Sequence, residues 1–536
     1  MSTARPPHRS LLSPPATPNK WLTMFAVCLG LGMLMIDTFV VNVAFPSIGK
    51  DLNANLSTAE WTVSGYVLVL GVLPLAMGRL GDLFGRRRLY MIGLVVFVLS
   101  SAASGFAANI EQLIAFRLVQ GVGAAIMMPG TLSIITAAFP AEQRGLAIGV
   151  WGGVSGLGLI AGPLLGGVLV ETGDWRWIFL VNVPLGIVAM AMAIRWVGES
   201  RDERAPRSID WAGVTLLATG LLAIMYGLTR ANEEGWTAPF ILACFGGGAA
   251  ALVLFVFVES RVRAPLVDLS LFRVGPFVMS CISAFLFSAA VFGSQPFSSL
   301  FMQNYMGLSP IEGGLAFLPA TALVAILMPV SGILGQRLGS RLRLIVIAGS
   351  LSVAASFVYL LTMDVDASYG RDLFPAFVLR GLGIGLVMSA TSLATMGSVP
   401  VMRAGLASGT LTMFRQVGTA LGVAVFGAVY LQHVDSSIPQ RLEAAPEAQV
   451  AGVVAAADRF VPAGQGEVRT AAQEEIVNGF VLLSGAGVAI AALAVGTAAF
   501  IRYRAPASAP IASPAASPAP PRPVVAADAT ARFQEP

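Results

Sequence analysis

The stretch GRLGDLFGRRR at residues 78–88 recurs as GILGQRLGSRL at residues 332–342. Three glycines and one arginine match between the copies at a constant spacing of 254 residues. A weaker similarity links QGVGAAIMM (120–128) with RGLGIGLVM (380–388), where two glycines match. Two related halves of one chain would explain both repeats.

Long apolar runs surround these motifs. Hydrophobic residues make up 56% of the 536 positions and charged residues only 12%, whereas a soluble domain carries about 25% charge. Because a helix needs about 20 apolar residues to cross a bilayer, the chain is predicted to be an all-α polytopic membrane protein with fourteen transmembrane helices. The runs cover residues 21–45, 58–77, 88–107, 110–137, 146–170, 176–197, 210–229, 238–258, 274–302, 311–335, 342–363, 372–398, 404–432 and 476–500.

The repeats divide the fourteen helices into two six-helix bundles with two inserted helices between them. Two related bundles around a central cavity form the architecture of a rocking transporter. The Pro-, Ala- and Ser-rich ends are predicted to be disordered. The predicted parts are a tail at 1–20, a first bundle at 21–197, a linker with the two inserted helices at 198–273, a second bundle at 274–500 with a long outer loop at 433–475, and a tail at 501–536.

Arginine is concentrated in the connections that follow even-numbered runs. The excess of positive charge in cytoplasmic loops of membrane proteins predicts that both termini are cytoplasmic and that the chain is a multi-pass protein of the cell membrane. The net charge of +4 therefore reflects topology, and we expect no nucleic-acid partner. The three cysteines lie in apolar runs and are interpreted as small core residues, so the sequence predicts no metal site and no cofactor.

Five motifs in register resemble the major facilitator superfamily, specifically its fourteen-helix drug:proton antiporter branch of the multidrug efflux type. The resemblance extends from residue 21 to about residue 500. It implies the major facilitator fold and export of small molecules in exchange for protons by alternating access. The motifs are IDTFVVNVAFP (36–46), GRLGDLFGRRR (78–88), RLVQGVGAAIMMPG (117–130), GLIAGPLLGG (158–167) and WRWIFLVNVPLG (175–186).

The first-half copy of the repeat is predicted to form a conformational latch. Its glycines permit a tight reversal and close helix approach, and Asp82 should satisfy free N–H groups at the start of the next helix. The resemblance implies that Asp82 also latches the two halves; the alternative is a loop that only sets topology. Since Gln336 replaces Asp82 in the second copy, any latch is predicted to be one-sided. The latch residues are Gly78, Gly81, Asp82, Gly85, Arg86 and Arg87.

The GLIAGPLLGG run places small residues four apart, a stripe suited to close helix packing in a membrane. A proline inside it should kink the helix. The resemblance implies that this run marks antiporters and limits proton leak, whereas ordinary helix packing is the alternative. The residues concerned are Gly158, Gly162, Pro163, Gly166 and Gly167.

Asp37 is a carboxylate inside an apolar run, where a charge costs roughly 2.5–3.5 kcal/mol. It lies nine residues before Pro46, which places it about 12–14 Å below the outer surface, at the depth expected for Arg117. An Asp37–Arg117 pair is therefore predicted as the proton-coupling site. A fixed structural ion pair is the alternative.

The central cavity is expected to suit amphipathic, mostly apolar compounds, because methionine and aromatic side chains adapt to varied shapes. Arg415 could bind an anionic substrate group or pair with backbone carbonyls. Core or lipid-facing positions remain the alternative for each wall residue. The candidate cavity residues are Asn42, Gln120, Met127, Met128, Phe292, Phe297 and Arg415.

The sequence thus predicts a monomeric transporter in the lipid bilayer whose partners are protons and a small-molecule substrate. It is not predicted to be an enzyme: the two lysines occur in no phosphate-binding loop, and the two histidines cannot form a His-Glu-x-x-His site. A dedicated metabolite, siderophore or antibiotic exporter would carry similar motifs. A proton symporter and a non-transporting sensor also remain open.

Overall fold

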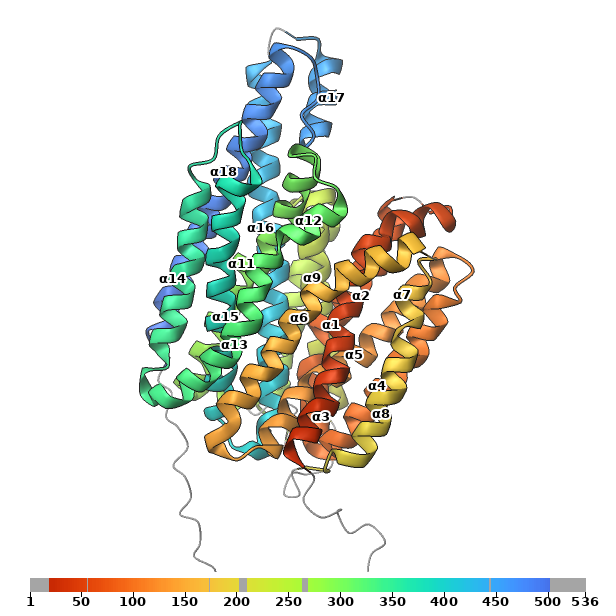
Figure 1. Cartoon of the computed structure of the whole chain (residues 1–536), viewed down its shortest axis with the longest axis vertical. Coiled ribbons are helices and arrows are strands. Elements are labelled where there is room, and N and C mark those ends of the chain that lie inside the picture. The colour runs from red at the N-terminus through yellow and green to blue at the C-terminus, as the bar shows by residue number, and fades with distance from the viewer. Residues whose placement is uncertain are drawn as a thin grey trace, which may run out of the picture. The chain divides into compact units, whose positions relative to one another are not determined.

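The computed structural model describes residues 19–54, 56–172, 174–201, 210–262, 269–442 and 445–501. Within these ranges the chain is helical, and no β-strand occurs in them. The predicted tails lie almost wholly outside the described residues. Figure 1 follows the helices from the N-terminus in red to α18 in blue.

All fourteen predicted runs are helical, some of them as two segments. The α-helices are α1 (Lys20–Asp51), α2 (Leu56–Val72), α3 (Pro74–Phe84), α4 (Arg86–Gly105), α5 (Ile110–Ala138), α6 (Arg144–Thr172), α7 (Trp177–Leu180), α8 (Asn182–Trp196), α9 (Trp211–Glu234), α10 (Pro239–Glu259), α11 (Gly275–Leu300), α12 (Pro310–Ala316), α13 (Leu318–Leu338), α14 (Arg343–Leu360), α15 (Phe374–Gly397), α16 (Ala404–Arg441), α17 (Glu447–Ala457) and α18 (Glu467–Ala498).

Eleven segments of the described residues are long and apolar enough to cross a membrane, or twelve if α2 and α3, which meet at a 51° bend, form one broken span. One of the eleven, Leu318–Leu360, contains both α13 and α14, which are separated by a short 3-10 turn. The chain is therefore a multi-pass membrane protein.

Local sequence sets where several helices begin and end. The side chain of Asn109 accepts a hydrogen bond from the Gln112 N–H at the start of α5, and the side chain of Asp210 accepts one from the Gly213 N–H at the start of α9. Such side chains satisfy N–H groups that lack a partner inside the helix. Gly85 ends α3 with φ of +112°, a backbone conformation that glycine adopts without strain.

The helices pack in two sets. In the first set α1 packs against α6 and α8, and α5 packs against α2 and α4. In the second set α11 packs against α16 and α18, and α15 packs against α13 and α14. We call these sets the first and second bundle. The most extensive contacts between them are α6 with α13 and α3 with α16.

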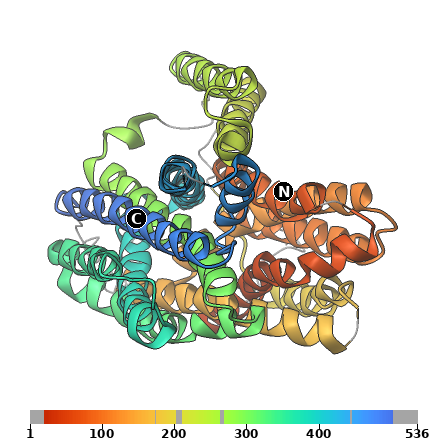
Figure 2. The same cartoon turned by 90° about the horizontal axis from the view of Figure 1, so that it is seen from above.

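The two inserted helices lie against each other as a pair. α9 contacts α16 of the second bundle and α2 of the first, while α10 packs chiefly on α9. Figure 2 shows this yellow-green pair at the edge of the helices. Stacking of Trp61 in α2 on Tyr226 in α9, with ring centroids 5.7 Å apart, helps to hold the pair in place.

The segment at 433–475 is more ordered than the predicted long outer loop. α16 continues to Arg441, α17 occupies Glu447–Ala457, and α18 begins at Glu467 (Figure 1). α16 therefore extends beyond the apolar run at 404–432. Arg441 pairs there with Glu474 and Glu475.

Candidate functional site

The Asp37 carboxylate lies at the centre of a fully buried polar cluster in the first bundle. Arg117 Nη1 in α5 donates to Asp37 Oδ2 at 2.7 Å, and Gln120 Nε2, one turn along α5, donates to Asp37 Oδ1 at 2.8 Å. Arg117 also donates to Gln120 Oε1 at 2.8 Å. All three side chains are 0% exposed. The residues predicted to pair are in contact, and Gln120 belongs to this cluster.

Sequence reasoning missed two members of the cluster. Asn182 Nδ2 in α8 donates to Asp37 Oδ1 at 2.9 Å and to Ser101 Oγ in α4 at 3.0 Å. Asn182 lies in the WRWIFLVNVPLG motif, but nothing in that motif reveals which carboxylate it faces. Asp37 of α1 thus accepts hydrogen bonds from α5 and α8, and Ser101 of α4 supports Asn182.

The guanidinium of Arg117 is held from two further directions. Its Nε donates to the Thr62 carbonyl at 2.9 Å, and its Cζ lies 4.1 Å from the centroid of the Tyr66 ring. A cation over an aromatic face gains electrostatic stabilisation. Among the described residues, Arg117 Nη2 and Asn182 Oδ1 are buried without a hydrogen-bond partner. One donor and one acceptor of the cluster are therefore unused.

The glycine stripe of α6 packs directly against α1 on both sides of Asp37. A Cβ at Gly158 would lie 2.3 Å from Met35 Cβ, and one at Gly162 would lie 2.7 Å from Phe39 Cβ. Small residues are thus required for this close helix contact. Gly166 is also buried. The surroundings of Pro163 and Gly167 lie outside the described part, and the kink at Pro163 stays a prediction.

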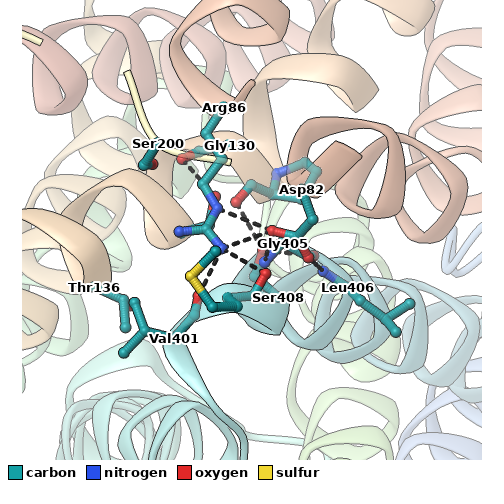
Figure 3. Close-up of polar contacts among 12 residues, drawn as sticks. Asp82, Arg86, Gly130, Thr136, Ser200, Val401, Gly405, Leu406 and Ser408 are labelled. Carbon is teal, nitrogen blue, oxygen red and sulfur yellow. Dashed lines mark hydrogen bonds and ion pairs between the residues drawn. The ribbon is translucent and has the colours of Figure 1, made fainter. Parts of the chain in front are cut away.

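Asp82 and Arg86 lie at the predicted cytoplasmic end, where they join the two bundles (Figure 3). Asp82 accepts hydrogen bonds from the N–H groups of Gly405, at 2.9 Å, and Leu406, at 2.8 Å. The prediction that Asp82 caps the next helix is wrong: it lies near the end of α3 and caps α16 of the other bundle. A carboxylate at a helix N-terminus pairs with free N–H groups and with the helix dipole.

Arg86 completes the link. It donates to Asp82 Oδ1 at 2.7 Å and to the carbonyls of Val401, at 2.6 Å, and Met402, at 3.0 Å (Figure 3). Both side chains of the ion pair are at most 2% exposed. Arg87 has a different position, since its Nη2 donates to the Ile194 carbonyl within the first bundle.

The latch glycines have different roles. A Cβ at Gly78 would lie 2.2 Å from the carbonyl oxygen of Gly405, so α3 and α16 touch there through their backbones. A Cβ at Gly81 would meet nothing closer than 3.7 Å. Gly85 supplies the turn between α3 and α4, against which the Glu199 carboxylate packs. Only Gly78 is needed for the contact between bundles.

The second copy of the motif makes a matching contact, so the prediction of a one-sided latch is wrong. A Cβ at Gly332 would lie 2.0 Å from the Gly145 carbonyl oxygen. Gln336 Oε1 accepts from the Gly145 N–H at 2.9 Å, and its Nε2 donates to the Ala141 carbonyl. One neutral amide thus performs the accepting role of Asp82 and the donating role of Arg86.

The expected cavity residues do not form one group. Met127 is fully buried between α1 and α4, next to Gly30 and Gly93, and is a core residue of the first bundle. Phe297 packs against α16, where its Cζ would lie 3.4 Å from a Cβ at Gly427. Met128 and Phe292 are half-buried and pack against the main core, and the side chain of Asn42 lies outside the described part. Arg415 is buried in α16 of the second bundle.

Comparison with known proteins shows which proteins this chain is similar to. The family model of the Major Facilitator Superfamily matches residues 27–423. The chain is 35% identical over 422 residues to the "Tetracenomycin C resistance and export protein" of Streptomyces glaucescens, covering 78% of each chain. It is 35% identical over 430 residues to the "Multidrug resistance protein Stp" of Mycobacterium tuberculosis strain H37Rv, covering 79% of this chain and 78% of the relative.

The fold also matches solved structures. The proton:xylose symporter XylE aligns with 91% of this chain and 97% of its own chain, at a TM-score of 0.58 and 14% identity. This likeness concerns the fold alone.

Proposed function

Because this chain belongs to the major facilitator superfamily and is a transporter rather than an enzyme, we propose that it exports amphipathic drug-like molecules from the cell in exchange for protons. The names of the relatives, a tetracenomycin C export protein and a multidrug resistance protein, support drug export. Transport proceeds by alternating access between the two bundles.

The observation that carries this proposal is the buried Asp37 cluster. Protonation of Asp37 removes the charge that three donors, from Arg117, Gln120 and Asn182, now satisfy. Breaking a buried ion pair on one side costs about 3–5 kcal/mol, so the cluster must rearrange. Because the donors come from α5 and α8, a proton on Asp37 changes how these helices pack on α1.

The closed contacts at one end support a direction for this cycle. Both glycine crossings, Gly78 with Gly405 and Gly332 with Gly145, are made at the predicted cytoplasmic end. In the proposed cycle, protons reach Asp37, which is fully buried here, when the opposite end opens to the outside. Protonation then favours opening of the two crossings, through which the substrate enters from the cytoplasm or inner leaflet.

The test is substrate-induced proton movement in proteoliposomes containing the wild type or Asp37→Asn. The amide keeps the size of the side chain and removes the titratable group. We expect the wild type to exchange protons for lipophilic drugs, and Asp37→Asn to bind the same drugs without exchange.

Asp51→Asn is the matched control, because Asp51 lies on the same helix but is 48% exposed and pairs with Arg176 at the surface. It should exchange protons as the wild type does. Normal exchange by Asp37→Asn would show that Asp37 is structural. Movement of protons and drug in the same direction would identify a symporter, and a wild type that moves neither would fit a sensor.

A further inference from the structure

Two guanidinium groups of the second bundle are buried without a carboxylate partner among the described residues. Arg380 is 5% exposed and Arg415 is 8% exposed, yet neither forms an ion pair within that part of the chain. By contrast, Asp37 is paired with Arg117 and Asp82 with Arg86. A buried charge is costly unless it is paired, so these two arginines need an explanation.

Arg380 is compensated within its own bundle. Its Cζ lies 4.5 Å from the Phe357 ring centroid and 5.9 Å from that of Phe377, and it donates to the hydroxyls of Ser298 and Ser356. A guanidinium over an aromatic face is stabilised electrostatically, and more strongly when it is desolvated. All four neighbours belong to α11, α14 and α15 and hold Arg380 within the second bundle, although its Nη2 is buried without a hydrogen-bond partner among the described residues.

Arg415 has no such cation–π contact within the described part of the chain. Its three hydrogen bonds all come from Nη2 and reach the Met388 carbonyl at 2.9 Å and the hydroxyls of Thr391 and Ser392 at 3.0 Å. Its buried Nε has no hydrogen-bond partner among the described residues. A guanidinium offers five N–H donors in a planar fork. Arg415 is therefore held in position by one nitrogen while the donor on Nε remains available.

The helix segments that hold Arg415 border the first bundle on two sides. A Cβ at Gly71 in α2 would lie 3.5 Å from the Cβ of Gln416, the residue after Arg415. A Cβ at Gly152 in α6 would lie 3.3 Å from the Oγ of Ser389, the residue after Met388. Ser389 Oγ is itself buried without a partner in the described part. Two unused donors thus lie on segments that face the boundary between the bundles.

We propose that Arg415 binds the acidic group of the exported compound, a carboxylate or an ionised phenol, with Ser389 as a second donor. Thr391 and Ser392 are positioning residues that orient the guanidinium. An anionic oxygen supplies the charge and the acceptors that Arg415 lacks, and a planar carboxylate matches the guanidinium fork. This inference rests on the proposed export function and specifies its substrate class: organic anions are preferred over cations, because the acid of the first bundle is already paired with Arg117.

The test compares two dyes that share a xanthene ring, anionic carboxyfluorescein and a cationic rhodamine ester. Binding and dye-driven proton movement are measured for wild type, Arg415→Gln, Arg415→Lys and the control Arg380→Gln in proteoliposomes. A hydrogen bond to a charged group contributes about 1.5–3 kcal/mol. We therefore expect the ratio of anionic to cationic dye transport to fall about 10- to 100-fold in Arg415→Gln, less in Arg415→Lys, and not at all in Arg380→Gln.

Equal loss of both dyes in a correctly folded Arg415→Gln variant would make Arg415 structural and overturn the inference. The inference is also overturned if Arg380→Gln changes the charge preference instead, or if wild type neither binds nor moves the anionic dye. A wild type that exchanges protons for the cationic dye alone refutes the anion site but leaves proton-coupled export standing. Export of dye without any proton movement refutes the proposed proton coupling. The ratio of anionic to cationic dye transport still tests the role of Arg415 in that case.

Discussion

The two crossings between the bundles have the same backbone geometry and different chemistry. In one, α3 meets α16 at Gly78 and Gly405; in the other, α13 meets α6 at Gly332 and Gly145. The first is closed by an Asp82–Arg86 ion pair, the second by the single amide of Gln336. Ser340 stands where the first copy has Arg86, so the acid and the base have been replaced together.

This difference indicates which part of the contact is indispensable. Both crossings keep the glycines and bond to the first turn of the facing helix, but only one keeps the charges. A buried ion pair often stabilises little more than a neutral pair of similar shape. Losing one member of the ion pair nevertheless destabilises the contact strongly, because the other charge then stays buried and unpaired.

The largest effect is expected from adding a methyl group at either crossing. Gly78→Ala and Gly332→Ala would place a Cβ 2.2 Å and 2.0 Å from backbone carbonyl oxygens that cannot move aside. Both variants should open the closed end. Spin labels at Arg88→Cys and Met402→Cys, both exposed positions on opposite bundles, should report a longer distance. Gly81→Ala is the control, since its nearest contact is 3.7 Å, and equal opening by it would contradict the geometry.

A smaller and unequal effect is expected from the polar residues. Asp82→Asn leaves Arg86 buried without its acid and should destabilise the closed state by about 3–5 kcal/mol. Gln336→Leu leaves only the Gly145 N–H and Ala141 C=O unsatisfied, which costs about 1–3 kcal/mol. The same spin-label distance and the thermal unfolding midpoint measure the effect of each of these two variants.

The double variant Asp82→Gln with Arg86→Ser copies the second crossing into the first. It should destabilise the closed state less than Asp82→Asn alone does, because no unpaired charge remains. If the double variant is as open as the single one, the ion pair has a role beyond compensation of charge, and the two crossings are not equivalent.

The smallest effect is expected at an exposed ion pair. Hydrogen bonds from Arg176 and Trp175 hold the pKa of Asp51 below its usual range. The contribution of this pair to stability is therefore present above the unfolded pKa of about 3.9 and is lost only as the pH falls through the lowered folded value. Asp51→Asn should change stability by less than about 1 kcal/mol, with no change between pH 7 and pH 5. A pH-dependent difference in that window, seen in paired melting curves, would contradict this assignment.

Much of the fold could be predicted because a bilayer imposes strong local rules. Each span needs an apolar run, so all fourteen helical runs were found, whereas their ends were less certain. α16 and α18 extend beyond their apolar residues because Arg441, Glu474 and Glu475 pair between them. A pairing between residues so far apart in the chain has no signature in local hydropathy.

The candidate site could be predicted only in part. Asp37 and Arg117 were found because a charge in an apolar run is costly and because their depths match. Asn182 and Ser101 were missed, since polar residues of this kind are common in membrane helices and their partners lie on other helices. Met127 is a candidate for the cavity wall or for the core in the sequence, and the structure places it in the core; helical spacing does not reveal which face meets a neighbour.

The sequence by itself determined the membrane class, the helical runs, the internal repeat and the family. Only the tertiary structure decided that Asp82 caps α16 rather than its own neighbour, that Gln336 makes the matching contact, and that the Nε donor of Arg415 has no partner among the described residues. The physical reason is that hydropathy and charge act on each segment separately. Hydrogen bonds between distant segments depend on distances of a few ångströms, which arise only when the helices pack.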